Sequence, residues 1–225
     1  MIYVTGDTHG FLNFDKIIQA IKANQIKSGD YLIIAGDFGG VWDKTSLSHT
    51  ISLIDALPCT ILFVDGNHEN FDIINSFPIT YWNNGKIHKI SHNLFHLMRG
   101  QVYLINNISI LALGGAESTD KEYRIPFVSW WPNESINIGD IIEAKTNLGN
   151  LRHVDYIVTH TCAEQHIVDV MLELRKDRKI QTSEILLNNL CDMCTFKQWY
   201  FGHWHMDLQI SNNVRAVYND IIRLD

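Results

Sequence analysis

Residues 60–70, TILFVDGNHEN, join an apolar run to a dense polar cluster. The run from Thr60 to Val64 is typical of a strand buried on both faces. Four polar side chains then follow within five positions: Asp65, Asn67, His68 and Glu69. A surface turn also uses Asp-Gly and Asn, because both tolerate unusual backbone angles. The stretch therefore predicts a strand and leaves two interpretations of the polar cluster, an ordinary turn or a functional site.

Two earlier segments repeat this arrangement. Residues 2–4 precede TGDTHG, and residues 31–35 precede GDFGG. Between the three apolar runs, residues 13–22 place their apolar side chains on one helical face, and a second helical pattern at 51–57 stops at Pro58. The first third of the chain is therefore predicted to be β-α-β-α-β with a parallel sheet.

The rest of the chain mixes strands and helices. Residues 93–98, 101–105 and 109–113 are predicted to form a meander, joined by Arg99-Gly100 and Asn106-Asn107. Residues 116–140 are aromatic, polar and aperiodic, which predicts a long loop, and a loop of this length is usually functional or disordered. Helical patterns follow at 139–150 and 164–190, and strands are predicted at 155–159, 198–201, 206–210 and 214–218.

Composition bounds the class of protein. Hydrophobic residues make up 46% of the 225 and charged residues 19%, so we expect one globular α/β domain over residues 1–225. The net charge of −7 disfavours binding to duplex nucleic acid. With no signal-like start and no long apolar segment, we expect no membrane association and a cytoplasmic location. The four scattered cysteines are predicted to be free thiols.

Potential metal ligands follow several of the predicted strands directly. Because sites form at the carboxyl ends of strands in open α/β sheets, we expect these side chains to converge. Two Asp, four His and one Asn are more ligands than one tetrahedral zinc needs, and they suit two octahedral-leaning metals that share a carboxylate. The seven are Asp7, His9, Asp37, Asn67, His160, His203 and His205.

Five short motifs carry a resemblance. DTH at 7–9, GD at 36–37, GNHE at 66–69, His160 and GHWH at 202–205 resemble the signature of the calcineurin-like metallophosphoesterases. The resemblance implies an αββα sandwich of two mixed sheets flanked by helices. It also implies hydrolysis of phosphate esters by direct attack of a metal-bridging hydroxide.

The resemblance also implies a role for each matching residue. Asp7, His9, Asp37 and His205 match the ligands of one metal, whereas Asp37, Asn67, His160 and His203 match those of the second. Asp37 would bridge the two ions, and His68 would act as the catalytic acid toward the leaving oxygen. For the two divalent ions, Mn²⁺ is our first choice in vitro, and Fe, Zn or Ni suit the same ligands.

The chain departs from the protein-phosphatase branch of this family at two positions. Gly40 and Val41 stand where that branch has an Asp behind the catalytic His and an Arg over the phosphate. A Ser/Thr protein phosphatase is therefore disfavoured. Three acids are candidates to orient His68 instead: Asp43, Glu69 and Asp72.

The long loop offers replacements. Arg124 is a candidate phosphate ligand, and Trp130 or Trp131 could stack on a planar group. The alternative is that the tryptophans pack and the Arg is solvated. The cluster at 175–179 is predicted to be a solvated helix face, and the other histidines are predicted to be structural or exposed: His49, His88, His92, His96, His153 and His166.

Three functions are compatible with these residues. The leading hypothesis is a phosphoesterase acting on mono- or diesters of a small molecule, plausibly a nucleotide. The second is a protein phosphatase, disfavoured by Gly40 and Val41. The third is a non-catalytic metal-binding interaction module, disfavoured because all seven ligand positions and His68 are present.

Overall fold

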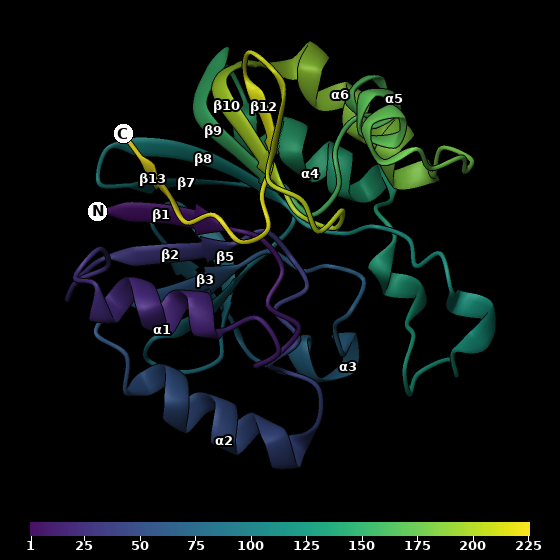
Figure 1. The fold of residues 1–225 in the computed structure, drawn as a ribbon. Coiled ribbons are helices and arrows are strands. Elements are labelled where there is room, and N and C mark those ends of the chain that lie inside the picture. Colours follow the sequence, from purple (N-terminus) through teal and green to yellow (C-terminus); the bar gives the residue numbers. More distant parts are fainter.

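The computed structural model describes residues 1–225 and contains two mixed β-sheets packed face to face with helices outside (Figure 1). One sheet has the strand order β13-β1-β2-β3-β6-β5-β4, and the other has the order β11-β12-β10-β9-β8-β7. The predicted αββα sandwich is confirmed. The helices are α1 (Asp15–Lys22), α2 (Lys44–Asp55), α3 (Phe71–Ile74), α4 (Ile138–Leu148), α5 (Glu164–Leu174) and α6 (Thr182–Met193).

The strands of the first sheet are β1 (Ile2–Thr5), β2 (Tyr31–Ile34), β3 (Thr60–Phe63), β4 (Ile79–Trp82), β5 (Gly85–Lys89), β6 (Leu94–Leu97) and β13 (Ile222–Leu224). Those of the second are β7 (Gln101–Ile105), β8 (Ile108–Leu113), β9 (His153–Thr159), β10 (Thr195–Phe201), β11 (Leu208–Ser211) and β12 (Val214–Ala216). Strands β1, β2 and β3 are parallel neighbours, as the β-α-β-α-β pattern predicts. Their carboxyl ends therefore lie along one edge of the first sheet.

Apolar side chains on alternate positions fill three core layers. On β2, Leu32 and Ile34 pack under α1 and α2, whereas Ile33 faces the second sheet. A third layer lies between the second sheet and the helices α4, α5 and α6. Strands buried on both faces must be apolar throughout, which is why the runs before the polar clusters are continuous rather than alternating.

The predicted meander is wrong at its first connection. Strand β6 pairs in parallel with β3 in the first sheet, whereas β7 pairs antiparallel with β8 in the second. Arg99-Gly100 therefore lies where the chain passes from one sheet to the other, and only the β7–β8 hairpin at Asn106-Asn107 is confirmed. The β4–β5 hairpin and strand β13 were not predicted.

The helical pattern at 164–190 forms two helices rather than one. Helix α5 ends at Arg175, whose φ of +51° is left-handed, and α6 begins at Thr182. The basic cluster at 175–179 lies in this connection, so its prediction as a helix face is wrong. Arg178 binds buried Glu184 and lies over the ring of Trp204 at 4.6 Å.

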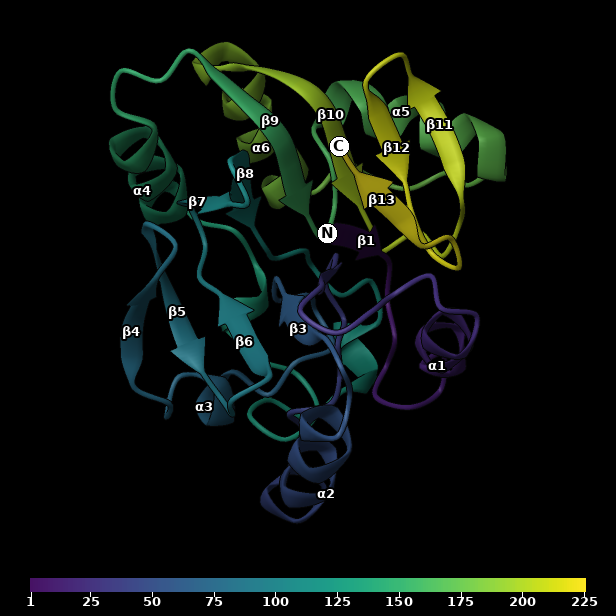
Figure 2. The same ribbon diagram turned by 90° about the vertical axis from the view of Figure 1, so that its left-hand side faces the viewer.

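Residues 114–137 form a long segment between β8 and α4. The segment contains only two short 3₁₀ helices, Lys121–Tyr123 and Pro132–Glu134, and the predicted loop is confirmed. Figure 2 shows the same fold turned by 90°, with both chain termini toward the viewer. None of the helices has the length and hydropathy needed to span a bilayer.

Candidate metal centre

Strand ends from both sheets supply the polar side chains of one site. Asp7 follows β1, Asp37 follows β2 and Asn67 follows β3. From the second sheet, His160 follows β9, and His203 and His205 follow β10. The structure brings these groups together, although they span almost the whole sequence.

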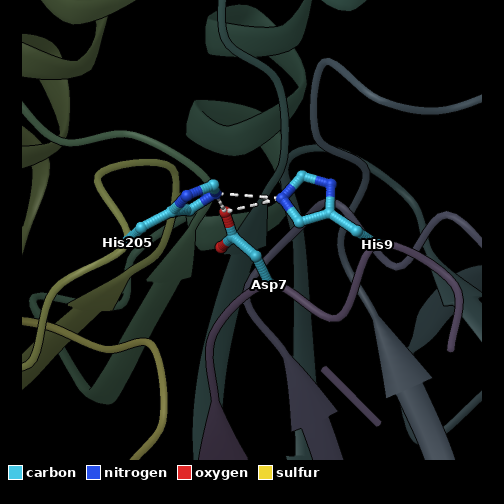
Figure 3. Close-up of side chains that lie close together, drawn as sticks. All are labelled: Asp7, His9 and His205. Carbon is cyan, nitrogen blue, oxygen red and sulfur yellow. Dashed lines mark hydrogen bonds and ion pairs between the residues drawn. The ribbon is translucent and has the colours of Figure 1, made fainter. Parts of the chain in front are cut away.

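The first part of the site contains Asp7, His9 and His205 (Figure 3). The Nε2 atoms of His9 and His205 face each other at 2.9 Å. The Nε2 atom of His205 lies 3.1 Å from Oδ2 of Asp7, and that of His9 lies 3.8 Å from carboxylate oxygens of both Asp7 and Asp37. Nitrogen and oxygen lone pairs converging at this spacing form a ligand set for a divalent metal.

The second part contains Asp37, Asn67 and His160. The Nε2 atom of His160 lies 3.1 Å from Oδ1 of Asn67 and 3.3 Å from Oδ1 of Asp37. Its Nδ1 lies 2.9 Å from the carbonyl oxygen of Ala35 and donates to it, which leaves Nε2 free to bind a metal. The ring of His203 packs edge-to-face on His160 at 5.0 Å. Asp37 therefore lies between the two parts, where a bridging ligand is expected.

Buried carboxylates make this site attract positive charge. Asp7 and Asp37 are 0% and 2% exposed. Burial alone would raise the pKa of Asp37, but the facing histidines, His160 first, hold it well below its usual range. Burial lowers the pKa of His160, but the carboxylates of Asp37 and Asp7 raise it to about 10. The donor set thus fits divalent cations in charge and in chemistry.

The backbone is strained at four of the candidate metal ligands. His9, Asp37, His203 and His205 all have positive φ, between +46° and +67°, although none is glycine. Residues other than glycine seldom adopt this backbone conformation, and those that do cluster at functional sites. Gly66 is required for a different reason, because a Cβ there would lie 2.1 Å from Oδ1 of Asp37. Gly66 therefore lets the turn after β3 lie directly against the carboxylate of Asp37.

His68 is placed by Asp37 and by a residue of the long segment. Its backbone N–H donates to Oδ1 of Asp37 at 2.7 Å. The guanidinium of Arg124 lies against the imidazole, with Nη2 at 3.0 Å from Nε2 and Nη1 at 3.3 Å from Nδ1. Burial lowers the pKa of His68, and the charge of Arg124 lowers it further, although Asp37 opposes both. Arg124 thus brings a positive charge to the side of His68.

None of the three acids expected to orient His68 contacts it. Asp43 caps α2 through Thr45 and Ser46. Glu69 is buried and accepts hydrogen bonds from the backbone of Phe38 and Gly39, and burial raises its pKa. Asp72 accepts from the indole of Trp131 at 2.8 Å. The interaction with His68 comes from Arg124 instead.

The two tryptophans differ. Trp131 is 2% exposed and packs edge-to-face against Trp42, so its ring presents no free face in this structure. Trp130 is half-buried beside it. The packing alternative therefore describes Trp131, and of this pair only Trp130 remains a candidate to contact a substrate.

Two positioning contacts were not anticipated from the sequence. The amide nitrogen of Asn67 donates to Oγ of Ser118, and Ser118 donates to buried Glu134, which turns the amide oxygen of Asn67 toward His160. Asp120 binds Arg124 at 2.8 Å. Both contacts come from the long segment, whose aperiodic sequence carried only the general signal of a functional loop.

Comparisons with known proteins agree with this geometry in part. Residues 1–207 match the family model described as calcineurin-like phosphoesterase. No curated protein matches the chain. Among solved structures, phosphopantetheinyl hydrolase from Mycobacterium tuberculosis aligns over 96% of this chain and 87% of its own, with 13% identity and a TM-score of 0.41. Similarity this low supports no inference about substrate.

Proposed function

Because the chain belongs to the calcineurin-like phosphoesterase family, we propose that it hydrolyses phosphate mono- or diesters of a small molecule or nucleotide with two divalent metal ions. The clustering of Asp7, His9, Asp37, His160 and His205 in overlapping groups of potential metal ligands around two buried carboxylates carries the proposal. When bound, two divalent ions supply Lewis acidity and lower the pKa of a coordinated water molecule. Mn²⁺ is the first ion to test, with Fe, Zn and Ni as alternatives.

The ligands divide between the two ions around Asp37. Asp7, His9 and His205 would hold one ion with Asp37, and Asn67, His160 and His203 would hold the other with the same carboxylate. The hydrogen bonds of His160 to Ala35 and of Asn67 to Ser118 orient two members of the second set without an ion. Such preorganisation supports tight and specific binding of metal.

His68 and Arg124 would act on the phosphoryl group. His68 would donate a proton to the departing oxygen, and Arg124 would place two N–H groups on phosphoryl oxygens in a forked arrangement. The contact between Arg124 and His68 supports this role, because it brings the guanidinium to the side of the imidazole. The location of Arg124 on a loop allows it to shift from the imidazole to the substrate.

Two residues supply a physical reason to disfavour the protein-phosphatase alternative. A Cβ at Gly40 would lie 2.6 Å from the ring of Phe38, so an acid at this position would force the ring aside. Val41 is fully buried and points no polar group toward substrate. Side chains from residues 114–137 would therefore take the place of the Asp behind the catalytic His and the Arg over the phosphate in that branch.

The test is hydrolysis of p-nitrophenyl phosphate, bis-p-nitrophenyl phosphate and a nucleotide panel by metal-stripped protein, with and without Mn²⁺. We expect turnover that depends on Mn²⁺ and disappears in Asp37→Asn. Phosphoserine peptides test the alternative function, and a preference for them as substrates would favour a protein phosphatase. Two bound metals with no turnover on any substrate would favour the interaction module.

A further inference from the structure

A second polar site lies away from the metal centre. A cavity of about 600 Å³ opens where β5, β6 and β7 meet α4 and the end of the long segment, and this size suits a small ligand. Figure 2 shows α4 above β5 on this side of the molecule. None of the expected metal ligands, His68 or Arg124 lines it. Seven charged or titratable residues do: Asp65, Lys86, His88, His96, Arg99, Asp140 and Glu143.

The histidines at the base of the cavity form a chain of hydrogen bonds that ends on Asp65. His88 and His96 are stacked and 4% and 5% exposed, with their Nδ1 atoms 3.0 Å apart. The Nε2 atom of His96 lies 3.1 Å from Oδ1 of Asp65. Nε and Nη2 of Arg99 donate to the other oxygen, Oδ2, so Asp65 is paired with a cation and is an acceptor for His96.

This chain of bonds fixes what His88 presents to the cavity. With both rings neutral and His96 donating from Nε2 to Asp65, Nδ1 of His96 accepts and His88 donates from Nδ1. Burial is the largest cause that lowers the pKa of His88, to about 4, so the ring is neutral at pH 7. The Nε2 atom of His88 is then a bare acceptor, and it has no partner in the protein although the residue is more than nine-tenths buried.

Two carboxylate oxygens add to this acceptor. Glu143 accepts hydrogen bonds from Lys86, Gln101 and Asn147 on Oε1 alone, which leaves Oε2 without a donor. Asp140 accepts on Oδ2 alone, which leaves Oδ1 free.

Both cations that line the cavity are paired with carboxylates, and Arg99 has no free nitrogen. All the nitrogens of Arg99 donate within the protein: Nε to Asp65, Nη1 to Ser135 and Asp140, and Nη2 to Asp65, Asn133 and Glu134. Lys86 is paired with Glu143 at 2.9 Å. With three carboxylates against two cations, the lining has a net negative charge and a surplus of acceptors. An anion finds no free Arg donor here, whereas a cation with several N–H groups finds acceptors.

We propose that this cavity binds a small molecule carrying a protonated amine, held by Nε2 of His88 and the free oxygens of Glu143 and Asp140. An ammonium group offers three donors and one positive charge, which matches three acceptors in a negatively charged pocket. The inference does not depend on the proposed hydrolase activity, because it uses different residues.

The test is isothermal titration calorimetry of the 225-residue protein at pH 7 with 1,4-diaminobutane and, as an uncharged analogue of the same length, 1,4-butanediol. We expect the diamine to bind at least about tenfold more tightly than the diol, as for hydrogen bonds to charged groups. Absence of diamine binding, or equal binding of the diol, would overturn the proposal.

Variants locate the binding. Glu143→Gln removes one charge at the cavity and should weaken diamine binding about tenfold. The control is Glu173→Gln, which removes one charge from an exposed residue of α5 and should change the affinity less than about twofold. His88→Phe keeps a ring that can stack on His96 but removes the acceptor nitrogen. It should weaken diamine binding about as much as Glu143→Gln does, and a cooperative melting curve shows that the variant is folded. Should that variant misfold, Glu143→Gln decides. Equal effects of Glu143→Gln and Glu173→Gln would contradict the assignment.

A metal control separates the two sites. The diamine could instead bind the acidic centre at Asp7 and Asp37, so the titration is repeated with saturating Mn²⁺. Unchanged affinity is the expected result. Displacement of the diamine by Mn²⁺ would place it at the metal centre and refute the cavity site.

Discussion

The strand ends and residues 114–137 both reach His68, but they differ in how their side chains are held. Asp7, Asp37 and Asn67 follow parallel strands of one sheet, so the backbone hydrogen bonds of the sheet fix their spacing. Arg124 lies in a segment with two single-turn 3₁₀ helices and is held mainly by Asp120. A rigid half therefore positions the candidate metal ligands, and a loop half positions the candidate contacts to substrate.

This difference decides which substitutions should abolish chemistry and which should change its specificity. A strand-end group that acts on the reacting atoms should affect the chemical step itself. A loop group that binds the phosphate should affect substrates according to how they use it. Substitutions in each half test that division.

His68→Ala should have the largest effect. Without a proton donor, hydrolysis of substrates with poor leaving groups should fall about 10²- to 10⁴-fold. Metal content, measured by elemental analysis, should stay at the wild-type value because His68 is not an expected ligand. His153→Ala, an exposed histidine at the start of β9, is the control. Unchanged turnover would remove His68 from the mechanism.

Arg124→Ala should lower kcat/KM by about 10²-fold, the usual scale for one charge-stabilising donor. Arg124→Lys should recover only part of this, because an ammonium lacks the forked pair of N–H groups. Lys121→Ala, an exposed cation on the same segment, is the matched control for charge. If the two alanine variants lose activity equally, the effect is one of net charge and not of position.

Histidines in the middle of strands should affect stability rather than activity. Folding lowers the pKa of His88 from 6.5 to about 4, so the unfolded chain binds more protons between these pH values. The free energy of unfolding should therefore fall as pH decreases from 6.5 toward 4, by about 2 kcal/mol from this group at pH 5. Urea unfolding at pH 7 and pH 5 measures this difference in the free energy of unfolding, and the difference should be smaller in His88→Phe. An equal loss in both proteins would assign it to other groups.

The rigid half was the part that sequence could predict. Continuous apolar runs such as Thr60 to Val64 identify strands buried on both faces, and residues directly after parallel strands must share an edge. The convergence of Asp7, Asp37 and Asn67 follows from that rule. His160 follows β9 of the other sheet, so its approach also depends on how the two sheets pack.

The errors arose where local sequence does not determine tertiary structure. Arg99-Gly100 has the composition of a hairpin turn, yet β6 and β7 join different sheets, because pairing depends on which apolar faces the sandwich buries. No Gly or Pro in the sequence marks the end of α5. The helix ends at Arg175, which adopts a positive φ although it is not glycine. Likewise, contacts between distant residues, such as that of Arg124 with His68, leave no periodic pattern in the sequence.

Asp120→Asn should have the smallest effect and gives the finest test of the loop half. Asp120 binds Arg124 but does not contact His68, so its removal should loosen the guanidinium and lower kcat/KM only about three- to tenfold. In Arg124→Ala the same change should have almost no further effect, because the two residues act through one contact. Additive losses of kcat/KM in the double variant would show that Asp120 acts independently of Arg124. Asp120 would then affect the site through another contact of the loop half.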